Sequence, residues 1–107
     1  MTDIKAFRKG SVPCGLEVRG HSGYAEKGED IVCSAVSVLV QTLYIGLADI
    51  ARIDVDSLVD DENAAISLKW QPTDESSVRV LTEAVFKALS ETAGAYGNYA
   101  QYVEVSL

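Results

Sequence analysis

Residues Gly20–Ser37 read GHSGYAEKGEDIVCSAVS, a glycine-rich polar segment that continues directly into an uncharged apolar one. The polar part carries the single histidine of the chain, His21, and the apolar part carries Cys33, one of two cysteines. The polar part, Gly20–Glu29, is longer than the usual connection of about four to six residues. This length and composition favour a mobile cover over a substrate, with a plain connection as the alternative.

The apolar part predicts a helix that begins at Asp30 and ends near Ile50. Asp30 suits the start of a helix because its carboxylate accepts hydrogen bonds from the free amides of the first turn. Cys33 then occupies the third helical position. Apolar residues occur on every side of this helix, so it needs cover from a sheet and also from a second helix, a partner subunit, or both.

The uncharged run from Ile31 to Ala48 is close to the length of a membrane-spanning helix. Polar residues interrupt the run, and no basic cluster flanks it to orient a span. We therefore favour the buried helix of a globular domain, and we expect no membrane partner.

The rest of the chain predicts strands from alternating apolar residues at 2–8, 14–19, 52–59, 64–70 and 99–107. A second helix is expected after Pro72, with Thr73 as its cap and a solvated charged ladder of Arg79, Glu83, Lys87 and Glu91. The order β-β-α-β-β-α-β predicts an α+β fold in which two helices pack on a mixed sheet. Residues 1–107 are expected to form a single domain.

The charge and the cysteine content narrow the class of protein. The formal net charge is -7 and the sequence pI is about 4.5, which opposes direct binding to nucleic acid or to an anionic membrane and suits a basic partner. Met1–Lys5 does not begin the apolar region of a signal peptide, and two cysteines are too few for a disulfide framework. We expect a cytoplasmic protein with reduced thiols.

His21 and Cys33 could act as a pair. A free thiol is only ~3% thiolate at pH 7, and lowering its pKa to about 6 needs about 3.4 kcal/mol. A helix N-terminus supplies about 0.3–1 kcal/mol, so a second positive group is required. His21 is the candidate for that group, with Cys33 as the nucleophile and His21 moving the proton to the leaving group. Free amides at the helix start could hold an oxyanion.

Other roles stay open at the neighbouring residues. Asp30 can orient the imidazole or serve only as a helix cap, and we favour the cap. Ser37 lies one helical turn after Cys33 and can bond either to the site or to its own helix. Cys14 is expected to pack inward as a small hydrophobe, and an inert, packed Cys33 is the plain structural alternative. The two cysteines and His21 fall short of a zinc tetrad, so we expect no metal and no cofactor.

The stretch Gly20-His21, Gly23, Gly28, Asp30-Ile31-Val32-Cys33, Ser34-Ala35 and Val36-Ser37 resembles the signature of the ribosomal-processing cysteine protease family, Prp. Members are small bacterial homodimers that remove an N-terminal extension, ending in an apolar aromatic-rich stretch, from the twenty-seventh protein of the large ribosomal subunit. The resemblance implies that His21 and Cys33 are the catalytic pair, that Gly20, Asp30 and Ser37 support it, and that Gly20–Glu29 covers the substrate.

Two features of the composition agree with that resemblance. An acidic chain suits a basic ribosomal substrate by electrostatic steering, and the apolar first helix suits burial in a homodimer. A different class of function remains as the alternative: a non-catalytic ribosome-associated or basic-protein-binding module in which Cys33 is packed and inert.

Overall fold

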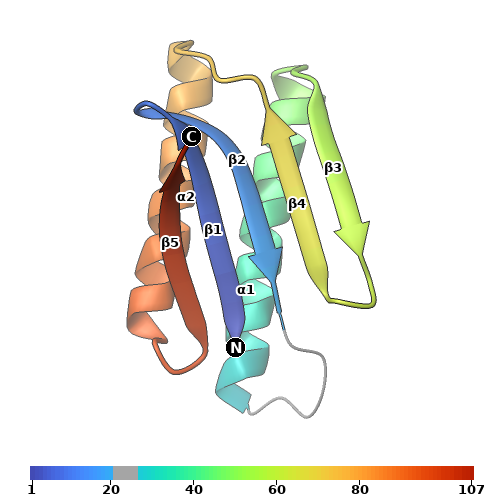
Figure 1. Ribbon diagram of the computed structural model, residues 1–107, viewed down its shortest axis with the longest axis vertical. Coiled ribbons are helices and arrows are strands. Elements are labelled where there is room, and N and C mark those ends of the chain that lie inside the picture. The colour runs from blue at the N-terminus through green and yellow to red at the C-terminus, as the bar shows by residue number, and fades with distance from the viewer. Residues whose placement is uncertain (21–26) are drawn as a thin grey trace.

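The computed structural model describes residues 1–20 and 27–107, and for residues 27–30 it describes the backbone alone. Five strands form one sheet in the order β3-β4-β2-β1-β5, and two helices cover the same face of it (Figure 1). The β1–β5 pair is parallel and the other pairs are antiparallel, which confirms the predicted mixed sheet and α+β fold. The strands are β1 (Thr2–Lys9), β2 (Val12–Arg19), β3 (Val55–Asp60), β4 (Ala65–Trp70) and β5 (Ala100–Ser106).

The β1–β2 hairpin sets which side chains face the helices. Gly10 closes it with φ +63, a left-handed angle that glycine adopts without a steric penalty. Ile4 and Ala6 of β1 pair with Val18 and Leu16 of β2, and all four side chains lie in the core. The register shifts between Phe7 and Arg8, and this bulge interrupts the alternation that the sequence predicts for β2.

The first helix begins earlier than the sequence predicts. Helix α1 spans Lys27–Tyr44 and continues as a π-helix, η1, over Ile45–Ile50. Its start lies three residues before Asp30, so Asp30 is in the first turn of the helix and is not its first residue. The physical reason is propensity, because Lys and Glu are strong helix formers and one glycine between them costs only about 1 kcal/mol.

Helix α1 is covered on one side. Val32, Val36, Val40 and Leu43 belong to the core, and α2 (Ser76–Ala95) packs beside α1. By length and composition the segment Ile31–Ile50 could cross a membrane, although 28% of it is buried inside the domain. The opposite side of the helix is open: Ile31, Val38 and Ile45 are 50%, 61% and 47% exposed. The expected cover by the sheet and by α2 is therefore present, and Ile31, Val38 and Ile45 lie outside it.

The start of α2 also differs from the expectation. Glu75 is the residue that precedes the first helical turn, and Thr73 lies outside the helix, where its hydroxyl accepts a hydrogen bond of 3.2 Å from the Glu75 amide. The physical reason is that Thr73 holds the turn before the helix through this local bond, so the cap position falls on Glu75.

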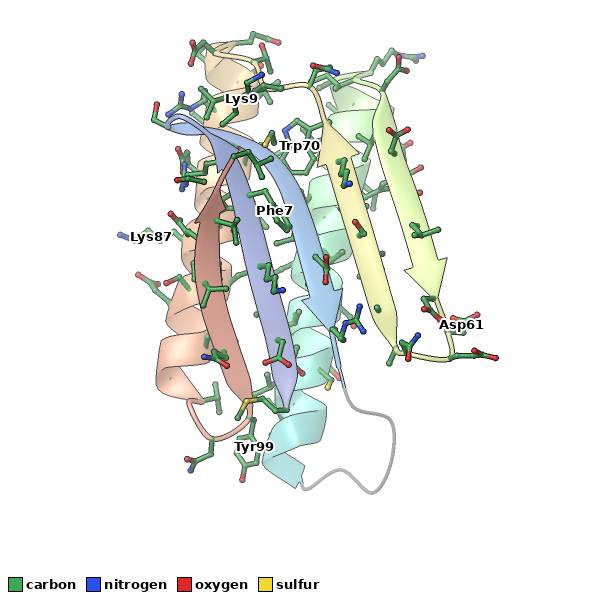
Figure 2. The ribbon with its side chains drawn as sticks, viewed as in Figure 1. Phe7, Lys9, Asp61, Trp70, Lys87 and Tyr99 are labelled. Carbon is green, nitrogen blue, oxygen red and sulfur yellow. The ribbon has the colours of Figure 1, made fainter. Side chains whose placement is uncertain are left out.

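The charged ladder of α2 is only partly solvated. Lys87 projects from α2 into solvent (Figure 2), and its ammonium lies 4.0 Å from the Glu91 carboxylate. Glu83, in contrast, turns toward the sheet and pairs with Arg8 of β1 at 2.7 Å. Lys87 and Glu91 thus lie on the open surface, and Glu83 ties the helix to the sheet.

Candidate active site

Four parts of the chain meet at one end of the molecule: the start of β1, the end of β2, the β3–β4 turn and the first half of α1 (Figure 1). Figure 2 shows Asp61 at the tip of the β3–β4 hairpin, at this same end. The elements enclose a surface hollow of about 390 Å³. Its lining comprises Thr2, Val18, Gly20, Cys33, Val36, Ser37, Val59, Asp60, Asp61, Ala64, Ala65 and Ile66.

Cys33 presents its thiol to this hollow from α1. Its side chain is half-buried, and its Sγ lies 3.5 Å from the Oγ1 of Thr2. Because α1 starts at Lys27, Cys33 is six residues into the helix and not in its first turn. An amide at that depth donates to the carbonyl four residues earlier. The expected oxyanion site at free amides beside Cys33 therefore does not fit this helix.

Gly20 follows the last residue of β2 and is the first residue of the motif. Its amide donates a 2.9 Å hydrogen bond to the carbonyl of Ala64, which fixes the end of β2 against the β3–β4 hairpin. A Cβ placed on Gly20 would meet Thr2 Oγ1 at 3.9 Å, an ordinary contact. The backbone angle of Gly20 is not left-handed either, so this position does not use the conformational freedom of glycine.

The remaining site residues of the sequence prediction divide into two groups. Ser37 lines the same hollow as Cys33, one turn later on α1, as its spacing predicts. His21 and the loop around it lie outside the described residues, as does the side chain of Asp30. The roles of His21 and Asp30 therefore stay predictions.

The wall of the hollow is apolar and its rim is acidic. Val18 and Val36 are 8% and 2% exposed and form part of the floor beside the thiol. At the rim, the Asn63 side-chain amide donates a 2.7 Å hydrogen bond to Asp60, which lowers the pKa of that carboxyl below its ordinary value. A cysteine sulfur in this position could attack a peptide whose apolar side chains pack against the apolar wall of the hollow.

In the part of the chain that the structure describes, no group of three or more His, Cys, Asp or Glu side chains is arranged to hold a metal ion.

Sequence reasoning did not find Thr2 or the Asp60–Asp61 rim. Thr2 lies 31 residues from Cys33 and carries no motif. The available signal was its parity on β1: it shares the inward row with Ile4 and Ala6, where a polar residue needs a partner. The rim residues belong to an acidic turn that the sequence marks but does not place beside α1.

A family model described as "Cysteine protease Prp" matches residues 1–101 of the chain. The search of curated proteins found no match to the chain.

Solved structures share the whole fold at low sequence identity. SMU.848 from Streptococcus mutans has a TM-score of 0.89 at 23% identity, covering 100% of this chain and 99% of its own. The "Essential Ribosomal Processing Protease Prp" from S. aureus, in complex with a substrate peptide, has a TM-score of 0.86 at 14% identity, covering 98% and 100%. The same protease with a covalently linked product peptide has a TM-score of 0.83 at 15% identity, covering 98% and 100%.

Proposed function

Because this chain belongs to the Prp family of cysteine proteases, we propose that it removes the N-terminal extension of the twenty-seventh protein of the large ribosomal subunit. Cys33 is the nucleophile and His21 the general acid and base in this proposal. The observation that carries it is the position of the Cys33 thiol, half-buried at an apolar hollow that is open to a peptide. Such a substrate is met in the cytoplasm.

The chemistry needs only these two side chains and water. The Cys33 thiolate attacks the scissile carbonyl, and the carbon–nitrogen bond breaks as His21 gives a proton to the leaving amine. A thioester then links the extension to Sγ. Water, deprotonated by His21, attacks the thioester and releases the carboxylate of the extension. Gly20, which precedes His21 in the sequence, lines the same hollow as Cys33, and this supports the pairing.

The hollow suits the kind of substrate that the family resemblance implies. Its wall includes the apolar side chains of Val18, Val36, Val59 and Ile66, which would hold the apolar end of the extension. The rim carboxylates of Asp60 and Asp61 and the net charge of -7 attract a basic ribosomal protein. The S. aureus ribosomal processing protease, which has the same fold, was solved in complex with a substrate peptide.

The substrate assignment is tested with the organism's own ribosomal protein at full length. The protease is incubated with this ribosomal protein and, in a separate reaction, with a form of the ribosomal protein that lacks the extension. The intact masses of the products are then followed. We expect a single cut near the N-terminus of the full-length form and none in the truncated form. Binding of both forms without a cut would overturn the proposal and favour the non-catalytic binding module.

We also propose that the active protein is a homodimer built on the open side of α1. Ile31, Val38 and Ile45 recur on that side and are about half exposed or more. A second copy of the same helix would cover them and would complete the burial that the apolar sequence of α1 requires.

Sedimentation of two charge variants tests the dimer. Val38→Glu places a carboxylate on the proposed interface, and Val80→Glu places one on α2, where Val80 is 70% exposed. We expect a dimer for the unmodified chain and for Val80→Glu, and a monomer for Val38→Glu. An unmodified chain that is monomeric at micromolar concentration would contradict the proposal.

A further inference from the structure

The inner row of β1 carries a polar side chain at each end, Thr2 and Arg8, and Arg8 pairs with Glu83 of α2. Thr2, Ile4 and Ala6 point toward the helices and are 2%, 0% and 0% exposed. A hydroxyl in such a row is costly unless it forms a hydrogen bond. Among the described residues, the partner recorded for the Thr2 hydroxyl is the sulfur of Cys33, at 3.5 Å. The two residues come from different elements, so the contact exists only in the folded domain.

The backbone holds Thr2 firmly in place. Its amide donates a 2.8 Å hydrogen bond to the Tyr99 carbonyl, and it pairs with Ala100 across the β1–β5 ladder. Since β1 has neighbours on both sides, the strand cannot shift without breaking two ladders. The β-branched side chain of threonine also has few rotamers. The hydroxyl is therefore held in place beside the sulfur of Cys33 before any substrate binds.

The direction of this hydrogen bond depends on the state of the sulfur. Between a thiol and a hydroxyl, either atom can donate. A thiolate has no proton and can only accept, so the Thr2 hydroxyl must then be the donor. Hydrogen bonds to a charged acceptor are about twice as strong as those between neutral groups. The same contact is therefore a stronger hydrogen bond when the sulfur is a thiolate.

We propose that Thr2 is a positioning residue for the nucleophile, whose hydroxyl donates to the Cys33 thiolate and keeps Sγ directed at the hollow. The inference rests on the proposed function, in which Cys33 attacks the substrate. It adds a hydroxyl, itself part of the lining of the hollow, that stabilises the reactive form of the sulfur in a helix whose free amides lie more than a turn away. In this proposal Thr2 acts through its contact with the sulfur.

Alkylation of Cys33 in three variants tests the proposal without any substrate. Thr2→Val and Thr2→Ala remove the hydroxyl, with and without conserving volume, and Thr2→Ser keeps it. Thr82→Val is the matched control, because Thr82 is equally buried and its hydroxyl donates to the Val78 carbonyl within α2. The rate of iodoacetamide labelling at Cys33 is followed by peptide mapping from about pH 5.5 to pH 9.

We expect Thr2→Val and Thr2→Ala to label about ten-fold more slowly than the unmodified chain near pH 6.5 and at the same rate near pH 9. Thr2→Ser should restore the rate, and Thr82→Val should leave it unchanged. With ribosomal substrate, Thr2→Val should lower kcat more than it raises KM. The agreement near pH 9 separates a loss of thiolate from a loss of folding, which would change labelling at every pH.

Labelling profiles of Thr2→Val and Thr2→Ala that match the unmodified chain at every pH would overturn the inference. If Thr2→Val does not fold, Thr2→Ala gives the same comparison, and a normal profile in it has the same meaning. Failure of the proposed function is a separate result: the unmodified chain would then cut no ribosomal protein, whatever the alkylation rates show.

Discussion

At the scale of single residues, the two cysteines of the chain have different surroundings. Cys14 is 7% exposed, and its thiol donates to the Phe7 carbonyl at 3.6 Å. Cys33 is half-buried at the wall of the hollow. A reagent in solution therefore reaches the sulfur of Cys33 more easily than that of Cys14, and a thiol must be accessible as well as ionised to react.

We therefore predict that iodoacetamide near pH 7 modifies Cys33 well before Cys14 in the folded protein. Peptide mapping after timed quenching measures the two rates in a single sample, so each cysteine is the control for the other. In urea, where burial is lost, both should be labelled at similar rates. Equal labelling of Cys14 and Cys33 in the folded state would contradict this description of the site.

At the scale of the elements, the contact between η1 and α2 depends on a glycine. A Cβ at Gly46 would overlap the side chain of Leu81 on α2. Gly94, near the end of α2, has no atom within 4 Å of the same hypothetical Cβ. The two glycines therefore differ in packing, although both lie in helical backbone.

Substituting alanine at each glycine separates packing from backbone propensity. Both substitutions gain the same helix preference, but Gly46→Ala must also displace Leu81. We predict that Gly46→Ala is less stable than Gly94→Ala by about 1–3 kcal/mol in urea unfolding. Equal stabilities would mean that η1 does not approach α2 as closely as the structure indicates.

The sequence predicted the elements better than their ends. Alternation and helical periodicity are local, so the five strands, the two helices and their order were all recoverable. The start of α1 was misplaced because the favourable cap chemistry of Asp30 competes with the helix propensity of the residues before it. That error placed Cys33 in the first turn beside free amides, whereas in the described part of the chain Cys33 lies beyond the first turn of α1.

Within the site, only what lies close along the chain was predictable. Cys33 and Ser37 are four residues apart and therefore share a helix face. His21 was predicted from the motif in which it lies. The contact of Thr2 with Cys33 depends on how β1 and α1 pack, which no local pattern contains. The acidic turn was visible in the sequence, whereas its position at the rim of the hollow depends on the strand order.

At the scale of the whole molecule, a charged cluster joins β1, α2 and β5. The guanidinium of Arg8 pairs with Glu83 at 2.7 Å and with Glu104 at 3.1 Å, and it lies 5.2 Å from the ring centre of Phe86. Hydrogen bonds from Arg8 are the main reason that the pKa values of Glu83 and Glu104 lie below their ordinary value of 4.5. The cluster thus couples three elements through two carboxylates.

This cluster should make stability depend on acid pH. Because both pKa values are lowered by folding, the unfolded chain takes up protons first. The stabilisation is complete above about pH 4.5 and is lost as the pH falls through the lowered values.

We predict that Glu83→Gln loses about 0.5–1 kcal/mol of stability at pH 7, a small value because this carboxylate is about a third exposed and screened by water. Its unfolding free energy in urea should also fall less between about pH 6 and pH 3 than that of the unmodified chain. Glu91→Gln is the control, because Glu91 is 72% exposed and its contact with Lys87 is long, at 4.0 Å. A pH dependence of Glu83→Gln equal to that of the control would contradict the prediction.

The central claim is that Cys33 is the nucleophile of a protease, and a single-turnover cleavage assay tests it most directly. Unmodified chain, Cys33→Ala and Cys14→Ala are each mixed in excess with the full-length ribosomal protein, and the cut product is measured by intact mass. We predict cleavage at the unmodified rate by Cys14→Ala and a loss of at least about a thousandfold for Cys33→Ala. Cleavage by Cys33→Ala at the unmodified rate would contradict the claim.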